Sequence, residues 1–301
     1  MTAHTLKALL NAGQFVACPG VFDLVSAKLA ERSAAKALYM TGYGTVASYL
    51  GLPDAGIATF SQMLDRVQTI AGAVTKPLIA DGDTGSGGLL NVHHTVRGYA
   101  RAGAAAIQLE DQQIPKKCGH TPNRHVVPLE EMVAKIKVAS DARASADFLI
   151  IARTDARSAL GLDEALRRGA AYAAAGADIL FIESPESEAE MRRIGRSFDV
   201  PVLSNQLHGG RTPILPQKAL QALGYALAIY PTAGLLAAAH ALESTFGSLA
   251  RDEPVQAPLY GFEEFVEMIG FPEVWAFEQK YAGLLDGAPS AATTVTEHSR
   301  R

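Results

Sequence analysis

Short apolar runs alternate with longer amphipathic segments from about residue 14 to about residue 250. Each short run has the length of a strand and is apolar on both faces, as a parallel strand covered by helices requires. The pattern predicts eight strands, within residues 14–20, 37–44, 77–83, 105–111, 148–156, 177–185, 200–206 and 225–231. It also predicts eight helices, within residues 23–33, 59–74, 91–104, 128–144, 161–177, 188–198, 215–224 and 234–250.

This alternation predicts a closed (β/α)8 barrel, or TIM barrel. Strands that alternate with helices form right-handed βαβ units and a parallel sheet. Eight such units account for residues 14–250 of the 301-residue chain, which is a typical size for the barrel. An open doubly wound sheet is the alternative, and it is disfavoured because no glycine-rich dinucleotide motif follows the first strand.

The alternation stops after about residue 252. Residues 255–287 are expected to form one or two aromatic-rich helices, and they contain the only tryptophan, Trp275. These aromatic rings need to be buried against the barrel or against another subunit. Residues 288–301 have the composition of a disordered tail. We therefore expect a single barrel domain with a helical C-terminal extension.

Composition narrows the class of protein. Hydrophobic residues make up 48% of the chain and charged residues 19%, which permits a large core. The net charge of −4 gives no indication of a nucleic-acid or anionic-membrane partner. Two cysteines make no disulfide framework, so a cytoplasmic location is expected. The most apolar stretch, residues 225–242, is interrupted by Pro231, Gly234 and His240, which indicates a buried strand and a packed helix rather than a membrane span.

Charged and polar residues stand at the carboxyl ends of five predicted strands. They are Asp81, Asp83, Glu110, Asp111, Arg153, Asp155, Glu183 and Asn205. In a barrel these ends share one face, where active sites lie. Helix capping accounts for Asp155. It does not account for Arg153 and Glu183, because isolated charges inside apolar runs are costly to bury.

The acidic residues of this set indicate a metal site. Asp81, Asp83, Glu110 and Asp111 are expected to converge from the third and fourth strands. Carboxylates repel one another unless a cation lies among them, and oxygen ligands favour Mg²⁺ or Mn²⁺. We expect one or two direct carboxylate ligands, with the other acids bridged by water. The alternative is an acid cluster neutralised by Arg153 and the lysines of the next loop.

The longest loop, residues 112–127, has the features of an active-site lid. Its sequence, QQIPKKCGHTPNRHVV, is polar and contains glycine and proline. Cys118 lies beside Lys116, Lys117 and His120, and these cations are expected to lower the pKa of its thiol. Such a thiol can act as a proton donor or a nucleophile near neutral pH. Cys18 lies within the first apolar run and is expected to be a core residue.

These motifs resemble those of a known family. KKCGH, at residues 116–120, is similar to the signature of the isocitrate lyase branch of the isocitrate lyase/phosphoenolpyruvate mutase superfamily. The other matching motifs are LYMTGYG (38–44), GLPDAG (51–56), DGDTGSGG (81–88), LEDQ (109–112), IARTDA (151–156) and NQLHGGRTP (205–213). The resemblance covers about residues 10–290. It implies a (β/α)8 barrel whose last helix is exchanged between neighbours, in a homotetramer built as a dimer of dimers.

The resemblance also implies Mg²⁺-dependent cleavage of a C–C bond in a 2-hydroxy acid with several carboxylates. The residues expected around Mg²⁺, directly or through water, are Asp54, Asp81, Asp83 and Glu110, with Asp81 as the direct ligand. The residues expected to contact the substrate are Thr41, Gly42, Tyr43, Asp54, Gly119, Arg153, Glu183 and Asn205. Arg153 would bind the carboxylate of the 2-oxo-acid product.

The catalytic residues implied by the resemblance lie mainly in the lid. Cys118 would protonate the departing carbanion, with Lys116 and His120 beside it. The family usually has glutamate where this chain has His208. The sequence leaves three interpretations of this histidine open. It acts as a base, it indicates a different reaction, or it is a substitution that the reaction tolerates. Thr41 replaces the usual serine.

Within the branch, the motifs resemble the group of 2,3-dimethylmalate lyase and petal death protein. Enzymes for 2-methylisocitrate keep a cation after the last strand, where this chain has Leu235 and Leu236. A smaller dicarboxylate such as an alkylated malate is therefore favoured. Oxaloacetate hydrolysis is the first alternative, although Pro231 replaces the hydroxyl residue of those hydrolases. Phosphonate mutases lack the loop cysteine, and the intact set of Cys118, Asp81, Arg153 and Glu183 disfavours a dicarboxylate sensor without turnover.

Overall fold

The computed structural model describes residues 5–121 and 123–284 of the chain. These residues fall into two compact units, one that ends at Ala257 and one that begins at Pro258. The first unit contains all eight strands, and the second contains two short helices of the C-terminal extension. All residues of the candidate active site belong to the first unit.

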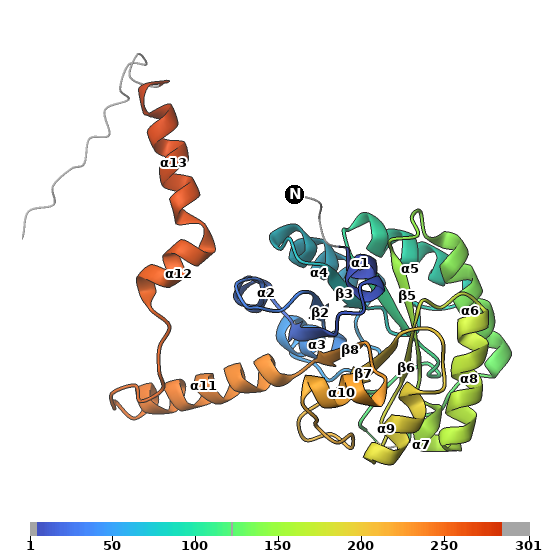
Figure 1. Cartoon of the computed structure of the whole chain (residues 1–301). Coiled ribbons are helices and arrows are strands. Elements are labelled where there is room, and N and C mark those ends of the chain that lie inside the picture. Colours follow the sequence, from blue (N-terminus) through green and yellow to red (C-terminus); the bar gives the residue numbers. More distant parts are fainter. Residues whose placement is uncertain (1–4, 122, 285–301) are drawn as a thin grey trace, which may run out of the picture. The chain divides into compact units, whose positions relative to one another are not determined.

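Eight parallel strands close into a barrel, in which each strand pairs with the next in sequence and the last pairs with the first. Figure 1 shows the strands at the centre, with helices outside them. The strands are β1 (Val16–Val21), β2 (Leu38–Met40), β3 (Leu78–Asp81), β4 (Ala106–Glu110), β5 (Leu149–Thr154), β6 (Ile179–Ile182), β7 (Val202–Asn205) and β8 (Leu227–Tyr230). The predicted (β/α)8 barrel is therefore confirmed, and the open sheet is excluded.

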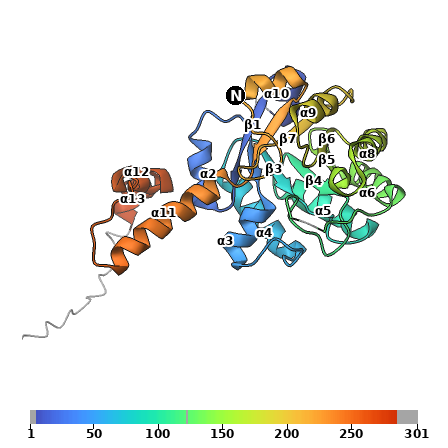
Figure 2. The ribbon, with the colours of Figure 1, turned by 90° about the horizontal axis from the view of Figure 1, so that it is seen from below.

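All eight helices that the hydrophobic pattern predicts are present. They are α2 (Leu24–Glu31), α4 (Phe60–Ala73), α5 (Leu89–Arg101), α6 (Leu129–Ala142), α8 (Leu162–Ala174), α9 (Glu188–Gly195), α10 (Gln217–Leu223) and α11 (Ala233–Ala250). Figure 2 shows α2 to α6 and α8 to α10 arranged around the strands. The prediction lacked three further helices, namely α1 (Leu6–Asn11), α3 (Gly42–Leu50) and α7 (Ala156–Leu160).

Successive residues of each strand pack into two different hydrophobic clusters, because side chains alternate between the faces of a strand. On β2, Tyr39 belongs to the cluster inside the barrel, whereas Leu38 and Met40 pack beneath the surrounding helices. Leu6 and Leu9 of α1 join the interior cluster together with the first residues of several strands. Helix α1 therefore covers the amino-terminal end of the barrel, and the carboxyl ends of the strands remain available for a site.

Helix α3 begins where the hydrophobic pattern predicted a continuation of the second strand. The hydroxyl of Thr41 accepts a hydrogen bond from the backbone N–H of Gly44 at 3.3 Å and so caps the helix. At the other end, Gly51 adopts a φ of +64°, a conformation that favours glycine and ends many helices. Hydrophobic periodicity did not reveal this helix, because glycine occupies two of its first three positions. The turn brings Tyr43 to the open end of the barrel.

The helices at the end of the chain expose many apolar side chains. In the first unit, α11 buries Ser248 and exposes Leu242, Phe246 and Leu249. The second unit consists of α12 (Phe262–Ile269), α13 (Phe271–Tyr281) and a 3₁₀ turn (Ala282–Leu284), and Trp275 on α13 is 54% exposed. The helices predicted within residues 255–287 are confirmed. The tail predicted at 288–301 lies outside the described residues.

The apolar stretch at residues 225–242 is strand β8 followed by the first half of α11, as predicted. Tyr225 is buried beneath the barrel helices, and α11 begins at Ala233, two residues after Pro231. Within the part of the chain that the structure describes, no helix is both long enough and apolar enough to cross a membrane.

Candidate active site

A cavity of about 270 Å³ opens at the carboxyl ends of the strands. Charged or polar residues at or next to the carboxyl ends of β3 to β7 line it, namely Asp81, Glu110, Arg153, Glu183 and Asn205. The expectation that these strand ends share one face is therefore confirmed. We call residues 112–127 the lid, and six of them also line the cavity, namely Lys116, Lys117, Cys118, Gly119, His120 and Thr121.

The remaining predicted site residues divide into two groups. Those that line the cavity are Thr41, Tyr43, Asp54 and His208. Gly42 and Asp83 instead contact residues of the cavity wall. The backbone N–H of Gly42 donates to Oδ2 of Asp81 at 3.3 Å, and Asp83 pairs with Lys116. A side chain at Gly42 would place its Cβ 2.6 Å from the same Asp81 oxygen, so the glycine allows this contact.

Asp81 and Glu110 are two of the buried carboxylates of the cavity wall. Besides Gly42, the backbone N–H of Asp83 donates to Asp81, at 3.2 Å. Burial raises the pKa of Asp81 to about 6, and the neighbouring Asp83 carboxylate acts in the same direction. Burial also raises the pKa of Glu110 well above its usual value, although Arg153 acts in the opposite direction. Both carboxylates would therefore gain from an additional cation in the cavity.

The ammonium group of Lys116 lies among these acids. Its Nζ is 2.5 Å from Oδ1 of Asp54 and 2.5 Å from Oδ1 of Asp83. Burial lowers the pKa of Lys116, but the surrounding carboxylates outweigh burial, and the pKa lies well above its usual value. Lys116 therefore stays charged and fastens the lid to the acid cluster.

The acid cluster fits a hard divalent cation with few direct protein ligands. Asp54, Asp81, Asp83 and Glu110 supply four carboxylates around the single ammonium of Lys116. The buried Oε1 of Glu110 has no hydrogen-bond partner among the described residues. Within residues 5–121 and 123–284, no three Asp, Glu, His or Cys side chains are arranged to hold one ion by themselves. Mg²⁺ commonly binds through one or two carboxylates and several waters, so this arrangement is compatible with it.

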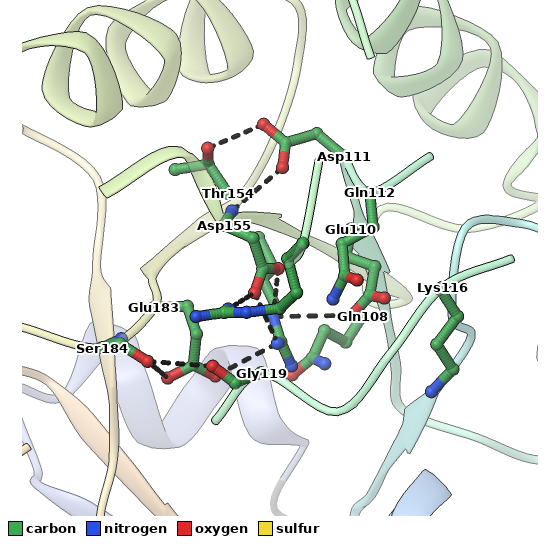
Figure 3. A network of polar contacts seen from close by, with 12 residues as sticks. Gln108, Glu110, Asp111, Gln112, Lys116, Gly119, Thr154, Asp155, Glu183 and Ser184 are labelled. Atoms are coloured by element: carbon green, nitrogen blue, oxygen red, sulfur yellow. Dashed lines mark hydrogen bonds and ion pairs between the residues drawn. The ribbon is translucent and has the colours of Figure 1, made fainter. Parts of the chain in front are cut away.

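Asp111 does not belong to the acid cluster, and the expectation that it converges there is wrong. Its Oδ2 accepts hydrogen bonds from the hydroxyls of Thr154 and Tyr172, both at 2.7 Å. Its Oδ1 accepts from the backbone N–H of Asp155 at 2.9 Å. Figure 3 shows Asp111 pointing toward Thr154 and away from Glu110. The two acids are neighbours in sequence, and successive side chains along a strand point to opposite faces.

The guanidinium of Arg153 lies among three carboxylates. Nε and Nη2 each donate to Asp155 at 2.9 Å. Nε is also 3.4 Å from Glu110, and Nη2 is 3.3 Å from Glu183. No residue of the described chain accepts a hydrogen bond from Nη1. The N–H groups of Nη1 can therefore bind a carboxylate in the cavity.

Asp155 orients Arg153 and does not cap a helix with its side chain. It occupies the N-cap position of α7, but its carboxylate makes no capping hydrogen bond. Both carboxylate oxygens instead accept from Arg153. The capping role predicted for Asp155 is therefore wrong, because a buried guanidinium is the stronger partner.

The thiol of Cys118 is not activated by its neighbours in sequence, and the prediction of a lowered pKa is wrong. Burial raises the pKa of this thiol, and the backbone N–H of His120 and the charge of Arg153 offset this only in part. The ammonium of Lys116 pairs with Asp54 and Asp83 and is not directed at the sulfur. Cys118 therefore carries its proton at neutral pH, as a proton donor must.

The ring of His120 connects the lid to β6 and β7. Nδ1 accepts a hydrogen bond from the backbone N–H of Arg211 at 3.3 Å. Nε2 lies 3.3 Å from Oε1 of Glu183 and 3.3 Å from Nδ2 of Asn205. A ring nitrogen that accepts leaves the proton on the other nitrogen, so Nε2 donates to Glu183. Burial acts to raise the pKa of Glu183, but Arg153 and His120 outweigh it and hold that pKa far below its usual range.

The lid backbone passes directly over Arg153 at Gly119. A Cβ on Gly119 would stand 2.2 Å from Nη2 of Arg153 and 2.8 Å from Oε2 of Glu183, so glycine is required here. The hydroxyl of Ser184 donates to the Gly119 carbonyl oxygen at 3.1 Å. Ser184 itself has a φ of +59°, which is unusual for a residue with a side chain. Strained residues of this kind concentrate at functional sites.

The family model for phosphoenolpyruvate phosphomutase matches residues 6–250. The chain belongs to this family. It is 48% identical, over 284 residues, to 2,3-dimethylmalate lyase of Eubacterium barkeri, and the match covers 93% of this chain and 98% of the relative. The predicted membership of the isocitrate lyase/phosphoenolpyruvate mutase superfamily is thereby confirmed.

Solved structures of the superfamily have the same fold. Oxaloacetate acetylhydrolase in complex with the inhibitor 3,3-difluorooxalacetate is 35% identical, with a TM-score of 0.89 and coverage of 93% of this chain and 97% of that one. Phosphonopyruvate hydrolase in complex with oxalate and Mg²⁺ is also 35% identical, with a TM-score of 0.83 and coverage of 92% and 98%.

The sequence did not indicate several residues that line the cavity in this member of the family. They are Tyr39, Thr121, Leu207, Ile229 and Thr232. Tyr39 and Ile229 lie within strands, and the alternation of strand side chains would have placed them inside the barrel. The hydroxyl of Tyr39 donates to Oε1 of Gln108 at 3.3 Å. The hydroxyl of Thr232 is buried with no partner among the described residues, and no sequence pattern marks it.

A wider groove of about 700 Å³ lies at the opposite end of the barrel, near the starts of β3, β4 and β5. Two of the cations that line it have partners in the protein. Lys76 donates to the carbonyl oxygen of Ser33 at 2.6 Å, and Arg143 pairs with Asp178. The thiol, the acid cluster and the available Arg153 nitrogen all belong to the smaller cavity, which is therefore the candidate active site.

Proposed function

We propose that the protein is a Mg²⁺-dependent C–C bond lyase. Its substrate is a 2-hydroxy dicarboxylate, either an alkylated malate such as 2,3-dimethylmalate or an acid similar to 2-methylisocitrate. The products are a 2-oxo acid similar to pyruvate and a carboxylic acid. The observation that carries this proposal is the presence, in one cavity, of the protonated Cys118 thiol, the available Nη1 of Arg153 and the Asp81–Glu110 acid pair. The identity of 48% to a 2,3-dimethylmalate lyase supports it.

Asp81 and Glu110 would hold Mg²⁺, or Mn²⁺ in its place, with Asp54 and Asp83 contributing through water. The unpartnered Oε1 of Glu110 and the excess of carboxylates over cations support this assignment. The Mg²⁺ in the related phosphonopyruvate hydrolase structure is a further support. When bound, such an ion polarises substrate oxygens and lowers the cost of negative charge on them.

Arg153 would bind the carboxylate of the 2-oxo-acid half through Nη1, because its other two nitrogens are occupied by Asp155. Thr41 and Tyr43 would contact the same half from the start of α3. Asn205 donates to Glu183 at 3.1 Å, and its buried Oδ1 has no partner within the described chain, so this oxygen is free to accept from the substrate.

The cleavage step would need one base and one acid. His208 lines the cavity and would accept the proton of the 2-hydroxyl group. The C2–C3 bond then breaks, the hydroxyl-bearing carbon becomes the 2-oxo carbon, and the bonding electrons move to the second fragment. The Cys118 thiol would give its proton to C3 of that fragment and become a thiolate. The lid, fastened by Lys116 and His120, would exclude water from the carbanion.

The remaining wall of the cavity favours an alkyl group on the substrate. Ile229, Pro231 and Leu236 line it. A third carboxylate would need a cationic partner at this wall, and Leu236 cannot supply one. A malate with small alkyl substituents therefore matches the wall better than a tricarboxylate.

Oxaloacetate hydrolysis is the second candidate. It breaks a similar C–C bond, and the structural similarity to oxaloacetate acetylhydrolase, at a TM-score of 0.89, favours it. A phosphonate mutase activity is less favoured, because it does not need the thiol of Cys118.

We further propose a cytoplasmic homotetramer, built as a dimer of dimers in which α11 is exchanged between neighbours. The support for assembly comes from α11 itself, whose apolar side chains Leu242, Phe246 and Leu249 are exposed. Such a surface is costly in water and is usually covered by another subunit.

The decisive experiment is an assay of keto-acid release from (2R,3S)-2,3-dimethylmalate with Mg²⁺, coupled to lactate dehydrogenase. The wild type is expected to form pyruvate, and Cys118→Ser is expected to lose at least about a hundredfold in rate, the usual contribution of a general acid. Cys18→Ala is the matched control, because Cys18 is buried in the barrel interior away from the cavity. A folded wild type that forms no pyruvate would rule out this substrate and would make oxaloacetate the next one to test.

A further inference from the structure

Arg124 is a buried cation in an otherwise exposed part of the lid. Its side chain is 3% exposed, whereas the neighbours Asn123 and His125 are exposed. Each of its three nitrogens has a partner. Nε donates to the carbonyl oxygen of Thr121 at 3.1 Å, Nη2 donates to the hydroxyl of Ser158 at 2.8 Å, and Nη1 pairs with Oδ1 of Asp155.

Asp155 therefore joins two guanidinium groups. Its Oδ1 accepts from Nη1 of Arg124 and from Nη2 of Arg153, and its Oδ2 accepts from Nε of Arg153. The side chain of Asp155 is fully buried, and its backbone N–H is held by Asp111, as Figure 3 shows. Because its backbone is fixed, the Asp155 carboxylate is a short, rigid connection between the lid and Arg153.

The charges around Arg153 explain why this connection matters. Arg153 faces Asp155, Glu110 and Glu183, so three carboxylates share one guanidinium. An incoming substrate carboxylate would add a fourth negative charge. Arg124 neutralises Asp155 and keeps both of its oxygens directed at Nε and Nη2 of Arg153. The Nη1 side of Arg153 is thereby left for the ligand.

We propose that Arg124 is a positioning residue for Arg153. When the lid packs on the barrel, Arg124 reaches Asp155 and sets the orientation in which Arg153 binds a substrate carboxylate. This inference rests on the proposed function only in taking Arg153 as the carboxylate-binding group. The competing explanation is that Arg124 merely holds the lid in place.

The test measures the affinity of the full-length enzyme for oxalate in the presence of Mg²⁺, by isothermal titration calorimetry. Arg124→Met is expected to weaken oxalate binding about tenfold or more, the usual effect of losing a charged hydrogen-bonded partner. Arg124→Lys restores a positive charge near Asp155 and is expected to recover part of the affinity. His125→Gln, a neighbouring exposed lid residue, is the control and is expected to bind like the wild type.

Ser158→Ala separates positioning from simple fastening of the lid. It removes one lid contact of Arg124 and leaves the pair with Asp155 intact. Cleavage after Lys117 by a lysine-specific endopeptidase reports opening of the lid, and unlike trypsin this protease has no site at Arg124 that Arg124→Met would remove. Positioning predicts that Ser158→Ala speeds cleavage but keeps oxalate affinity within about twofold of the wild type. It also predicts that Arg124→Met raises KM more than it lowers kcat, because carboxylate binding acts before and during the reaction.

Two results would overturn the proposal. One is an Arg124→Met enzyme whose lid is cleaved faster while its oxalate affinity stays within about twofold of the wild type. The other is a wild type that binds no oxalate with Mg²⁺, since Arg153 would then not hold a carboxylate. Oxalate is not turned over, so the result is independent of the lyase reaction. If oxalate affinity depends on Arg124 but no 2-hydroxy dicarboxylate is cleaved, the positioning role stands and the proposed lyase function fails.

Discussion

Asp81 links the stability of the protein to pH and to metal. Burial, followed by the charge of Asp83, raises its pKa to about 6. A carboxyl group with a higher pKa in the folded state than in the unfolded chain costs stability as the pH rises. The cost begins near an ordinary Asp pKa of about 4 and is complete above about 6. Across this range it amounts to about 3 kcal/mol in the metal-free protein.

We therefore expect Asp81→Asn to be more stable than the wild type when metal is chelated. In EDTA at about pH 8 its Tm should be higher by about 5 °C, and the difference should shrink at about pH 5. Added Mg²⁺ should raise the Tm of the wild type and leave the variant unchanged. Thermal denaturation followed by circular dichroism measures both effects. Asp65→Asn, at an exposed position of α4, is the control, and an equal Tm difference at both pH values would contradict the raised pKa.

For single residues, the sequence predicted positions in the barrel but not interaction partners. The strand pattern correctly placed Asp81, Arg153 and Glu183 at one end of the barrel, because each stands at the carboxyl end of a predicted parallel strand. It did not predict the hydrogen-bond or ion-pair partner of each side chain. Asp155 binds Arg153 instead of capping α7, and Lys116 pairs with Asp54 and Asp83 instead of Cys118. Those choices depend on how the lid packs against residues distant in sequence.

At the scale of elements, the lid is the part that completes the site. Its buried contacts come from Lys116, Gly119 and Arg124, and each meets a different strand end or loop. Gly119 allows the closest approach, since a Cβ there would stand 2.2 Å from a nitrogen of Arg153. The guanidinium is buried and held by Asp155, so it cannot move aside cheaply.

We expect Gly119→Ala to prevent the lid from packing in this position. The rate constant kcat/KM should fall at least about a hundredfold, because a misplaced acid and an unsealed site both slow the reaction. The free energy of unfolding should change little, since the lid lies outside the core. Steady-state kinetics and denaturant unfolding measure the two effects. Gly72→Ala, a helical position with nothing within 4 Å of the added Cβ, is the control. Normal kcat/KM in Gly119→Ala would show that the lid packs differently during turnover.

The elements predicted from sequence are those with a strong periodic signal. All eight strands and eight helices of the barrel were found because each carries a periodic or continuous apolar pattern in the sequence. The missed helix α3 is rich in glycine, and the missed α1 and α7 have six and five residues. The extent of the lid, 112–127, was predicted from its composition and length. Its anchoring by Arg124 was not, because a lone arginine in a polar loop carries no pattern.

At the scale of the whole molecule, helix α11 of the first unit exposes an apolar face to solvent. Leu242, Phe246 and Leu249 on α11 are 51%, 61% and 60% exposed. Their spacing of four and three residues places them on one face of the helix. An apolar face of this kind is stable in water only when another surface covers it. The proposed tetramer would supply that surface from a second copy of the chain.

We therefore expect Phe246→Glu to weaken assembly. Sedimentation equilibrium of the wild type should give about four times the chain mass of 31.8 kDa, and the variant should dissociate to smaller species as it is diluted. A buried glutamate at an apolar interface is costly, which sets the direction of the effect. Ser244→Glu places the same charge on the opposite face of α11 and should leave the mass unchanged. A wild type that sediments as a monomer, or a Phe246→Glu protein that remains tetrameric on dilution, would show that this face of α11 does not hold the subunits together.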